Sequence, residues 1–229
     1  MQKITIKELV TFRRKSSDRT KKNYAYKLKY RKEKVKTETK NEGGGDYWIT
    51  STSCIYNVFK NDKKEYYDSK IEELQTKYEK TDDIRIKSMY ERNINILNSF
   101  KDFDFDELRP TEITKIEKVH TDSKIITKNA IPLYVNPSML FCHERNGKKE
   151  IGALWLVPQL EGFKKSELGM FCEILYQFLS NNYSANYQIS DDFCIVIDTF
   201  NTQTVTYSEL LNGKIPFLID ETINQIKNA

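Results

Sequence analysis

The most constraining stretch of this chain is residues 131–157, which has the pattern of two strands joined by a tight turn. Its last part, IGALWLV (151–157), carries no polar side chain. A strand that is apolar on both faces is typical of the centre of a sheet whose two sides are covered. Asn146 and Gly147 tolerate the positive φ angles that a two-residue hairpin turn requires. The stretch therefore predicts a hairpin with a central second strand, and other parts of the chain must cover both faces.

The segments around this hairpin alternate between the period of strands and the period of helices. Period-2 alternation precedes it, and a second buried strand, FCIVIDTF (193–200), follows it. Between the two lies a stretch with apolar residues three and four positions apart, which begins at a serine cap, Ser166. The predicted strands are 124–127, 131–135, 138–144, 150–157 and 193–200, and the predicted helices after the hairpin are 166–183 and 215–228.

The chain before residue 112 is mainly helical in pattern. Residues 51–60 form one predicted helix, and residues 62–100 form two helices or one bent helix with a break at KTDD (80–83). The predicted fold class is α+β with an α/β-like core, in which N-terminal helices precede a mixed sheet of about four to five strands with flanking helices. We divide the chain into a basic N-terminal arm, 1–42, and a single α+β domain, 43–229, with a helical part, 50–100, and a sheet core, 112–229.

The predicted arm is strongly positive. Residues 1–40 hold 15 Lys and Arg against 4 Asp and Glu, whereas the whole chain has a net charge of +4. Clustered cations are typical of a surface that binds nucleic acid, although a charge run is also typical of a solvated helix face. Tyr24, Tyr26 or Trp48 could stack on bases. The candidate nucleic-acid-binding residues are Arg13, Arg14, Lys15, Arg19, Lys21, Lys22, Lys27, Lys29, Arg31, Lys32 and Trp48.

A run of three glycines, 43–45, follows the arm. We interpret it as a linker, because glycine runs are common in flexible connections. The alternative is a phosphate-binding loop that leads into the helix predicted at 51–60. The lysine of the Walker pattern is absent from this position.

The cysteines and the hydropathy pattern predict the compartment. Cys54, Cys142, Cys172 and Cys194 are widely spaced and contain no Cys-x-x-Cys pair, which favours free thiols in a reducing compartment. The chain has neither an apolar leader nor an apolar run long enough to span a membrane. We therefore expect a cytoplasmic protein without membrane contact. The histidines and cysteines show no metal-ligand spacing, so we predict no metal site.

The order helix, hairpin, central strand, helix, strand over residues 112–212 resembles the PD-(D/E)XK nuclease superfamily, particularly its RecB-like exonuclease branch. In that family one hairpin strand carries an aspartate and the next carries Glu-x-Lys, which hold a divalent cation and orient the attacking water. Ser138 stands at the place of the aspartate here. Leu154 or Trp155 stands at the place of the glutamate, and Val157 lies near that of the lysine. The resemblance implies a nuclease-derived core that has lost catalysis.

Three functions follow as hypotheses. The first is a non-catalytic nucleic-acid-binding protein without a cofactor, such as a mobile element or a defence locus would carry. The second is a protein-binding adaptor that uses the helical pair 62–100 or the helix 166–183. The third is a metal-dependent nuclease that uses Mg²⁺ and whose acids have moved along the strands. Its candidate catalytic residues are Glu144, Glu150, Asp198 and Lys148.

Overall fold

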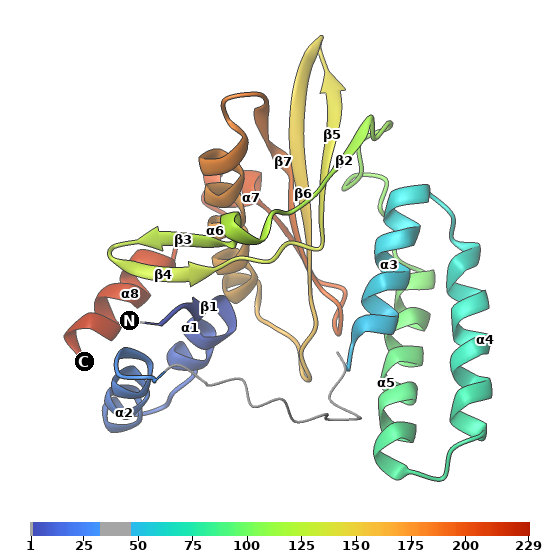
Figure 1. Cartoon of the computed structure of the whole chain (residues 1–229), viewed down its shortest axis with the longest axis horizontal. Coiled ribbons are helices and arrows are strands. Elements are labelled where there is room, and N and C mark those ends of the chain that lie inside the picture. Colours follow the sequence, from blue (N-terminus) through green and yellow to red (C-terminus); the bar gives the residue numbers. More distant parts are fainter. Residues whose placement is uncertain (1, 33–46) are drawn as a thin grey trace.

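The computed structural model describes residues 2–32 and 47–229, and its fold is α+β, as the sequence predicts (Figure 1). The boundary proposed at 42/43 and the glycine run 43–45 lie outside the described residues. In the described chain, a five-stranded mixed sheet and a three-stranded sheet are combined with helices. None of the helices in these two ranges is both long and apolar enough to cross a membrane.

The larger sheet contains the predicted hairpin at its centre. In spatial order it consists of β2 (Lys115–Glu117), β5 (Met139–Arg145), β6 (Lys148–Val157), β7 (Gln188–Asp198) and β8 (Thr204–Thr206). β5 and β6 are antiparallel, and the turn residues Asn146 and Gly147 have φ angles of 54° and 71°. β6 and β7 are parallel, and α6 (Lys165–Tyr183) makes the connection between them. Residues 150–157 of β6 are all buried, which confirms the predicted central strand.

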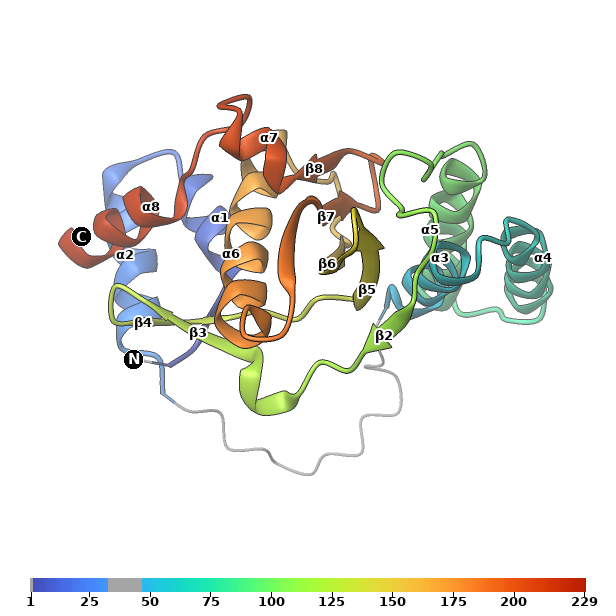
Figure 2. The same ribbon diagram turned by 90° about the horizontal axis from the view of Figure 1, so that it is seen from above.

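Alternate side chains of the larger sheet enter two separate cores. Leu140 and Ala153 belong to the core that also contains α6. Phe141 and Leu154 point the other way, into a core with three helices. These helices are α3 (Ile49–Asn61), α4 (Glu65–Glu79) and α5 (Ile84–Lys101). Figure 2 shows α6 and the α3–α5 group on opposite sides of the sheet, so both faces of β6 are covered.

The N-terminal residues belong to the main core and not to a separate arm. β1 (Ile4–Thr5) pairs in parallel with β4 (Ile131–Tyr134), which pairs antiparallel with β3 (Ile125–Lys128). The apolar residues of α1 (Ile6–Arg13) are buried in the core that contains α6. Burial of this much apolar surface holds the start of the chain against the body. The basic segment is therefore fixed at its N-terminal side.

Two further helices complete this side of the molecule. α2 (Asp18–Lys29) and α8 (Ile219–Asn228) pack beside α1 and against each other (Figure 1). α7 (Tyr207–Leu211) lies on α6, where the rings of Tyr207 and Tyr176 stack with centroids 3.7 Å apart. α2 begins directly after Ser17, which is its N-cap residue.

Candidate nucleic-acid interface

α2 has one side that packs on the protein. Ser17 caps the helix by accepting a hydrogen bond from the N–H of Thr20, with the two atoms 3.3 Å apart. Ala25 and Leu28, three positions apart on one side of the helix, are buried in the core shared with α1 and α8. This packing fixes the direction in which the opposite side of α2 points.

The opposite side of α2 carries exposed cations and tyrosines. At about 100° per residue, Arg19, Lys22, Tyr26 and Tyr30 lie within about 40° of one direction. Tyr26 and Tyr30 are each 66% exposed, and their ring centroids are 4.5 Å apart. Exposed aromatic rings among cations suit a single strand, whose bases stack on the rings while its phosphates meet the positive charges. We call Arg19, Lys22, Tyr26 and Tyr30 the α2 face.

Arg14, a candidate contact to nucleic acid, is held by the protein itself. Its Nη2 lies 2.6 Å from Oε2 of Glu167 and also donates to the carbonyl of Gly162. Burial raises the pKa of Glu167. Hydrogen bonds from Arg14 and from the backbone N–H of Lys164 have a larger combined effect in the opposite direction, so the pKa of Glu167 lies below its ordinary value. Arg14 is therefore a structural partner of α6.

Arg13 and Arg31 are also engaged. Arg13 contacts Glu221 of α8, with Nη1 and Oε2 3.3 Å apart. Arg31 forms an ion pair with Glu8 of α1 and donates to the carbonyl of Lys3. The Arg13 contact ties α1 to α8, and the Arg31 contacts tie the segment after α2 to the start of the chain. Both arginines consequently have part of their charge neutralised before any ligand arrives.

Two predicted lysines make weaker internal contacts. Lys15 Nζ lies 5.3 Å from the ring centroid of Tyr24. Lys29 Nζ donates to the carbonyl of Lys227 over 2.9 Å. Neither lysine meets a carboxylate within the described ranges, so no acidic side chain of those ranges offsets its charge.

The remaining predicted cations form no ion pair with any described residue. They lie on or beside α2, all exposed except the half-buried Lys21, and they supply positive charge that a polyanion could neutralise. They are Arg19, Lys21, Lys22, Lys27 and Lys32.

Trp48 does not belong to the α2 face. It is the N-cap residue of α3, and the start of α3 lies apart from α2 in both views (Figures 1 and 2). Together with Trp155 of β6 it lines a pocket of about 300 Å³. Ser138 and Val157 line the same pocket.

The four candidate catalytic residues do not form one centre. Glu144, Lys148 and Glu150 lie at the turn end of the hairpin, where Glu150 is opposite Gln188 of β7. Asp198 is opposite Val157, at the other end of β6. Seven residues along a strand separate the two ends by roughly 23 Å. A single cation cannot be held by groups this far apart.

Asp198 has a structural environment. Its side chain is fully buried and accepts hydrogen bonds from the N–H of Phe163 at 2.8 Å and of Phe200 at 2.9 Å. The side-chain amide of Asn201 donates a third, at 3.2 Å. Gly162 lies so close that a Cβ there would be 2.3 Å from Oδ2 of Asp198. Asp198 therefore fastens the loop after β6 to the end of β7.

Glu150 is also part of a structural group. Arg145 Nε donates to Oε1 of Glu150 at 3.1 Å, and Arg145 Nη1 contacts Asp192 at 2.8 Å. His143 is buried, and its Nε2 lies 3.5 Å from Oε2 of Glu150. Burial lowers the pKa of His143, and Arg145 lowers it further while Glu150 partly opposes this. The imidazole is thus neutral at neutral pH.

Sequence reasoning missed two residues of the candidate interface. Tyr30 is not among the predicted nucleic-acid-binding residues. A usable signal was its spacing of four residues from Tyr26, on a side of the helix away from the apolar residue Leu28. The sequence analysis places Trp155 in the central strand and at a possible position of the nuclease glutamate, and not in a pocket. Its place in the same pocket as Trp48 depends on how distant parts of the chain pack, which local patterns do not reveal.

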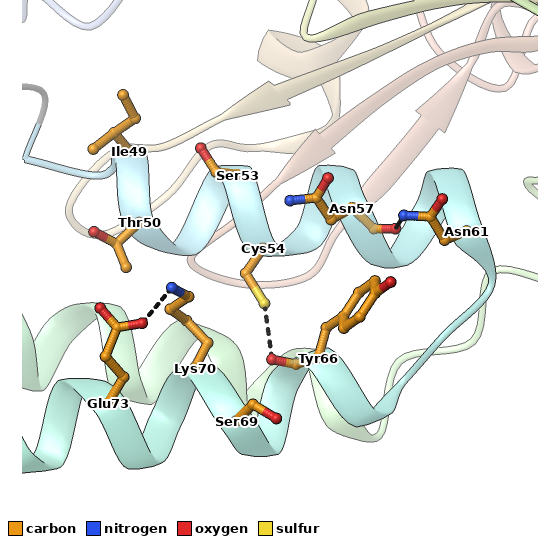
Figure 3. Close-up of a pocket in the computed structure, with 10 residues that line it drawn as sticks. All are labelled: Ile49, Thr50, Ser53, Cys54, Asn57, Asn61, Tyr66, Ser69, Lys70 and Glu73. Atoms are coloured by element: carbon orange, nitrogen blue, oxygen red, sulfur yellow. Dashed lines mark hydrogen bonds and ion pairs between the residues drawn. The ribbon is translucent and has the colours of Figure 1, made fainter.

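A second pocket, of about 610 Å³, lies between α3 and α4 (Figure 3). Most of its lining residues have polar side chains, and several of these make hydrogen bonds within the protein. Lys70 pairs with Glu73, and the Cys54 thiol donates to the carbonyl of Tyr66 (Figure 3). Burial raises the pKa of Cys54 to about 11. This thiol therefore remains protonated at neutral pH and is a poor nucleophile.

The raised pKa of Cys54 predicts slow alkylation. Because only the thiolate reacts, the rate with iodoacetamide at pH 8 is expected to be about a hundredfold below that of an ordinary exposed thiol. The rate should still rise about tenfold per pH unit between pH 8 and 10, since the pKa of about 11 lies above this window. Mass spectrometry of the Cys54 peptide measures it, with the protein in guanidinium chloride as the control. A plateau below pH 9 in the native protein would contradict the expected burial.

Comparisons with known proteins gave no match to this chain, either among protein-family models, among curated proteins or among solved structures.

Proposed function

We propose that this protein binds single-stranded nucleic acid through the α2 face and does not cleave it. The observation that carries the proposal is the exposed pair Tyr26 and Tyr30 next to Arg19 and Lys22, which have no acidic partner among the described residues. Rings of this kind stack on any base, and the cations neutralise phosphates. Such a surface predicts binding with little sequence preference and with a strong dependence on salt.

The topology of the larger sheet supports a nuclease-like core behind this surface. β2, β5 and β6 are successive antiparallel neighbours, and α6 leads from β6 to the parallel strand β7. This is the order on which the resemblance to the PD-(D/E)XK superfamily rests. The absence of catalysis is supported by the side chains at or near the motif positions, which are Ser138, Leu154 or Trp155, and Val157, and by the internal hydrogen bonds of Asp198.

Stacking on α2 predicts a defined loss on truncation of its tyrosines. The double variant Tyr26→Ala, Tyr30→Ala is expected to bind a short single-stranded oligonucleotide at least about thirtyfold more weakly, because two stacked bases are lost and each contributes roughly 1–3 kcal/mol. The slope of affinity against salt should not change, since no charge is removed. Fluorescence anisotropy with a labelled single strand at several salt concentrations measures both quantities.

The control for this variant is Tyr78→Ala, which truncates a tyrosine of α4 that is 36% exposed. It should bind the oligonucleotide as the unmodified protein does. A duplex of the same sequence should lose less affinity than the single strand in the double variant, because its bases are already stacked. Equal binding by the double variant and the unmodified protein would remove the α2 face from the proposal, and no binding of any nucleic acid would refute the function itself.

A second candidate function, protein binding through the helical pair, is favoured by one observation. Ile84 and Ile86, at the start of α5, are 79% and 38% exposed, and Tyr78 lies near the end of α4 before the same turn. Exposed apolar residues that lie together are typical of protein contacts. A partner captured by the unmodified protein but not by Ile84→Lys, at a salt concentration that abolishes nucleic-acid binding, would support this role.

A further inference from the structure

The pocket of about 300 Å³ lies where β6 ends, at the meeting point of three parts of the chain. The start of the chain contributes Thr5, the start of α3 contributes Trp48 and Thr52, and the segment from β4 to β5 contributes Asn136 and Ser138. Trp155 of β6 lies in its wall. A pocket this size is at the lower limit for ligand sites, which suits one planar ring system.

The walls of this pocket contain both tryptophans of the chain. Trp155 is 9% exposed and is held by the edge of Phe171, with centroids 5.3 Å apart at 87°. Trp48 is held by Tyr47, with centroids 4.7 Å apart at 67°. Each indole is thus fixed by an edge-to-face contact with a second ring. Large aromatic side chains that are already ordered lose little entropy when a flat ligand packs on them.

Two polar groups at this pocket are free to recognise a ligand. The side-chain amide of Asn136 is exposed and makes no hydrogen bond with a described residue. Ser138 Oγ accepts from the N–H of Leu156 at 3.0 Å, so its hydroxyl hydrogen remains available as a donor. An amide that both donates and accepts matches the mixed donor and acceptor edge of a nucleobase.

The charge around this pocket favours a ligand that carries phosphate. Lys3 Nζ lies 4.3 Å from the ring centroid of Tyr134, and Tyr134 lines the pocket. Lys7, whose Nζ donates to the carbonyl of Pro158 at 2.6 Å, lines it as well. Among the described residues that line the pocket there is no carboxylate. Within the described lining, an approaching phosphate therefore meets a lysine and no carboxylate.

We infer that this pocket receives one unstacked nucleobase of the single strand that binds to the α2 face. The inference rests on the proposed function, because it places one base of the same strand between Trp48 and Trp155. The indole rings supply the stacking contact, and Asn136 and Ser138 meet the edge of the base. The pocket makes the protein select single strands, since a paired base cannot enter it without leaving its duplex.

Both tryptophans lie in the pocket, so intrinsic fluorescence reports its occupancy directly. The experiment follows two signals in one titration: anisotropy of a labelled single strand for total binding, and tryptophan fluorescence for the pocket. The ligands are a mixed-sequence single strand, an abasic strand with the same phosphates, and an equimolar mixture of the four mononucleotides. We expect the intact strand to bind and to quench tryptophan emission. The abasic strand should bind about tenfold more weakly and without quenching.

The outcomes separate the two proposals. If the intact strand binds more tightly than the abasic strand but neither changes tryptophan emission, the pocket inference is wrong and stacking at the α2 face stands. If neither strand binds, the proposed function falls and the pocket inference falls with it. If the mononucleotides quench at the same concentration as the intact strand, the pocket takes a free nucleotide and its link to a bound strand is refuted.

Three variants assign the signal. Asn136→Ala changes an exposed side chain without a partner in the described structure, so it should fold normally. It is expected to reduce the preference for the intact strand over the abasic strand several-fold. Trp48→Phe and Trp155→Phe each leave one tryptophan as the reporter, and quenching should persist in both. The base would lie outside the pocket if two results were found together. Asn136→Ala would show the same quenching as the unmodified protein, and Trp48→Phe, which keeps Trp155, would show none.

Discussion

Exchange of Arg19, Lys22 and Lys27 for glutamine is expected to weaken single-strand binding at least about tenfold at low salt and to flatten its salt dependence. All three side chains are exposed and make no ion pair within the described ranges, so the structure should tolerate the exchange. Each phosphate contact to a single strand contributes about 0.7 to the slope of log K against log salt concentration. Loss of three contacts should therefore reduce the slope by about 2, as measured by anisotropy between 50 and 200 mM salt.

The matched control removes the same charge elsewhere. Lys60, Lys63 and Lys80 are exposed in or beside the helices α3 and α4, on the other side of the larger sheet (Figure 2). Their exchange for glutamine lowers the net charge equally and should leave the slope almost unchanged, because screened charges at this distance contribute little. Equal effects of the two triple variants would mean that binding follows net charge alone. The α2 face would then have no special role.

The fold was largely predictable because the decisive signals are local. Asn146 and Gly147 specify a hairpin turn through their backbone conformations, and the run 151–157 specifies a strand that must be covered on both sides. The break at 80–83 is equally local, because Asp83 accepts hydrogen bonds from the first N–H groups of α5. Each of these features depends on residues a few positions apart, so periodicity and turn chemistry are enough to find it.

The role of the N-terminal segment could not be predicted in the same way. β1 is only two residues long, and its partner β4 lies more than 120 residues later in the chain. Charge counting identified the cations after it but could not separate those that bind the protein from those that face solvent. Arg14 is neutralised by Glu167 of α6, and Lys22 is not neutralised by any described residue. The distinction depends on which distant helix packs beside each residue.

Asp198 is expected to have the largest effect on stability among the residues first considered as catalytic. Asp198→Ala leaves the buried N–H group of Phe163 and the part-buried N–H group of Phe200 without an acceptor, and a buried group of this kind costs about 1–3 kcal/mol. The free energy of unfolding should therefore fall by about 2–5 kcal/mol, as measured by urea denaturation. Asp198→Asn should lose less, because one amide oxygen can still accept while its NH₂ group faces donors.

Asp192→Ala serves as the control, because this carboxylate is 52% exposed in its contact with Arg145 and such pairs contribute at most about 1 kcal/mol.

The stability series also decides between structure and catalysis at Asp198. If Asp198 were a buried metal ligand, it would repel neighbouring acids when the metal is absent. Its replacement would then leave the free energy of unfolding unchanged or raise it. The same replacement would remove any cleavage that depends on Mg²⁺ or Mn²⁺. An acceptor for backbone N–H groups has the opposite pattern, with a large loss of stability and no metal-dependent cleavage in either protein. Because the three donors to Asp198 already occupy both of its oxygens, we expect the second pattern.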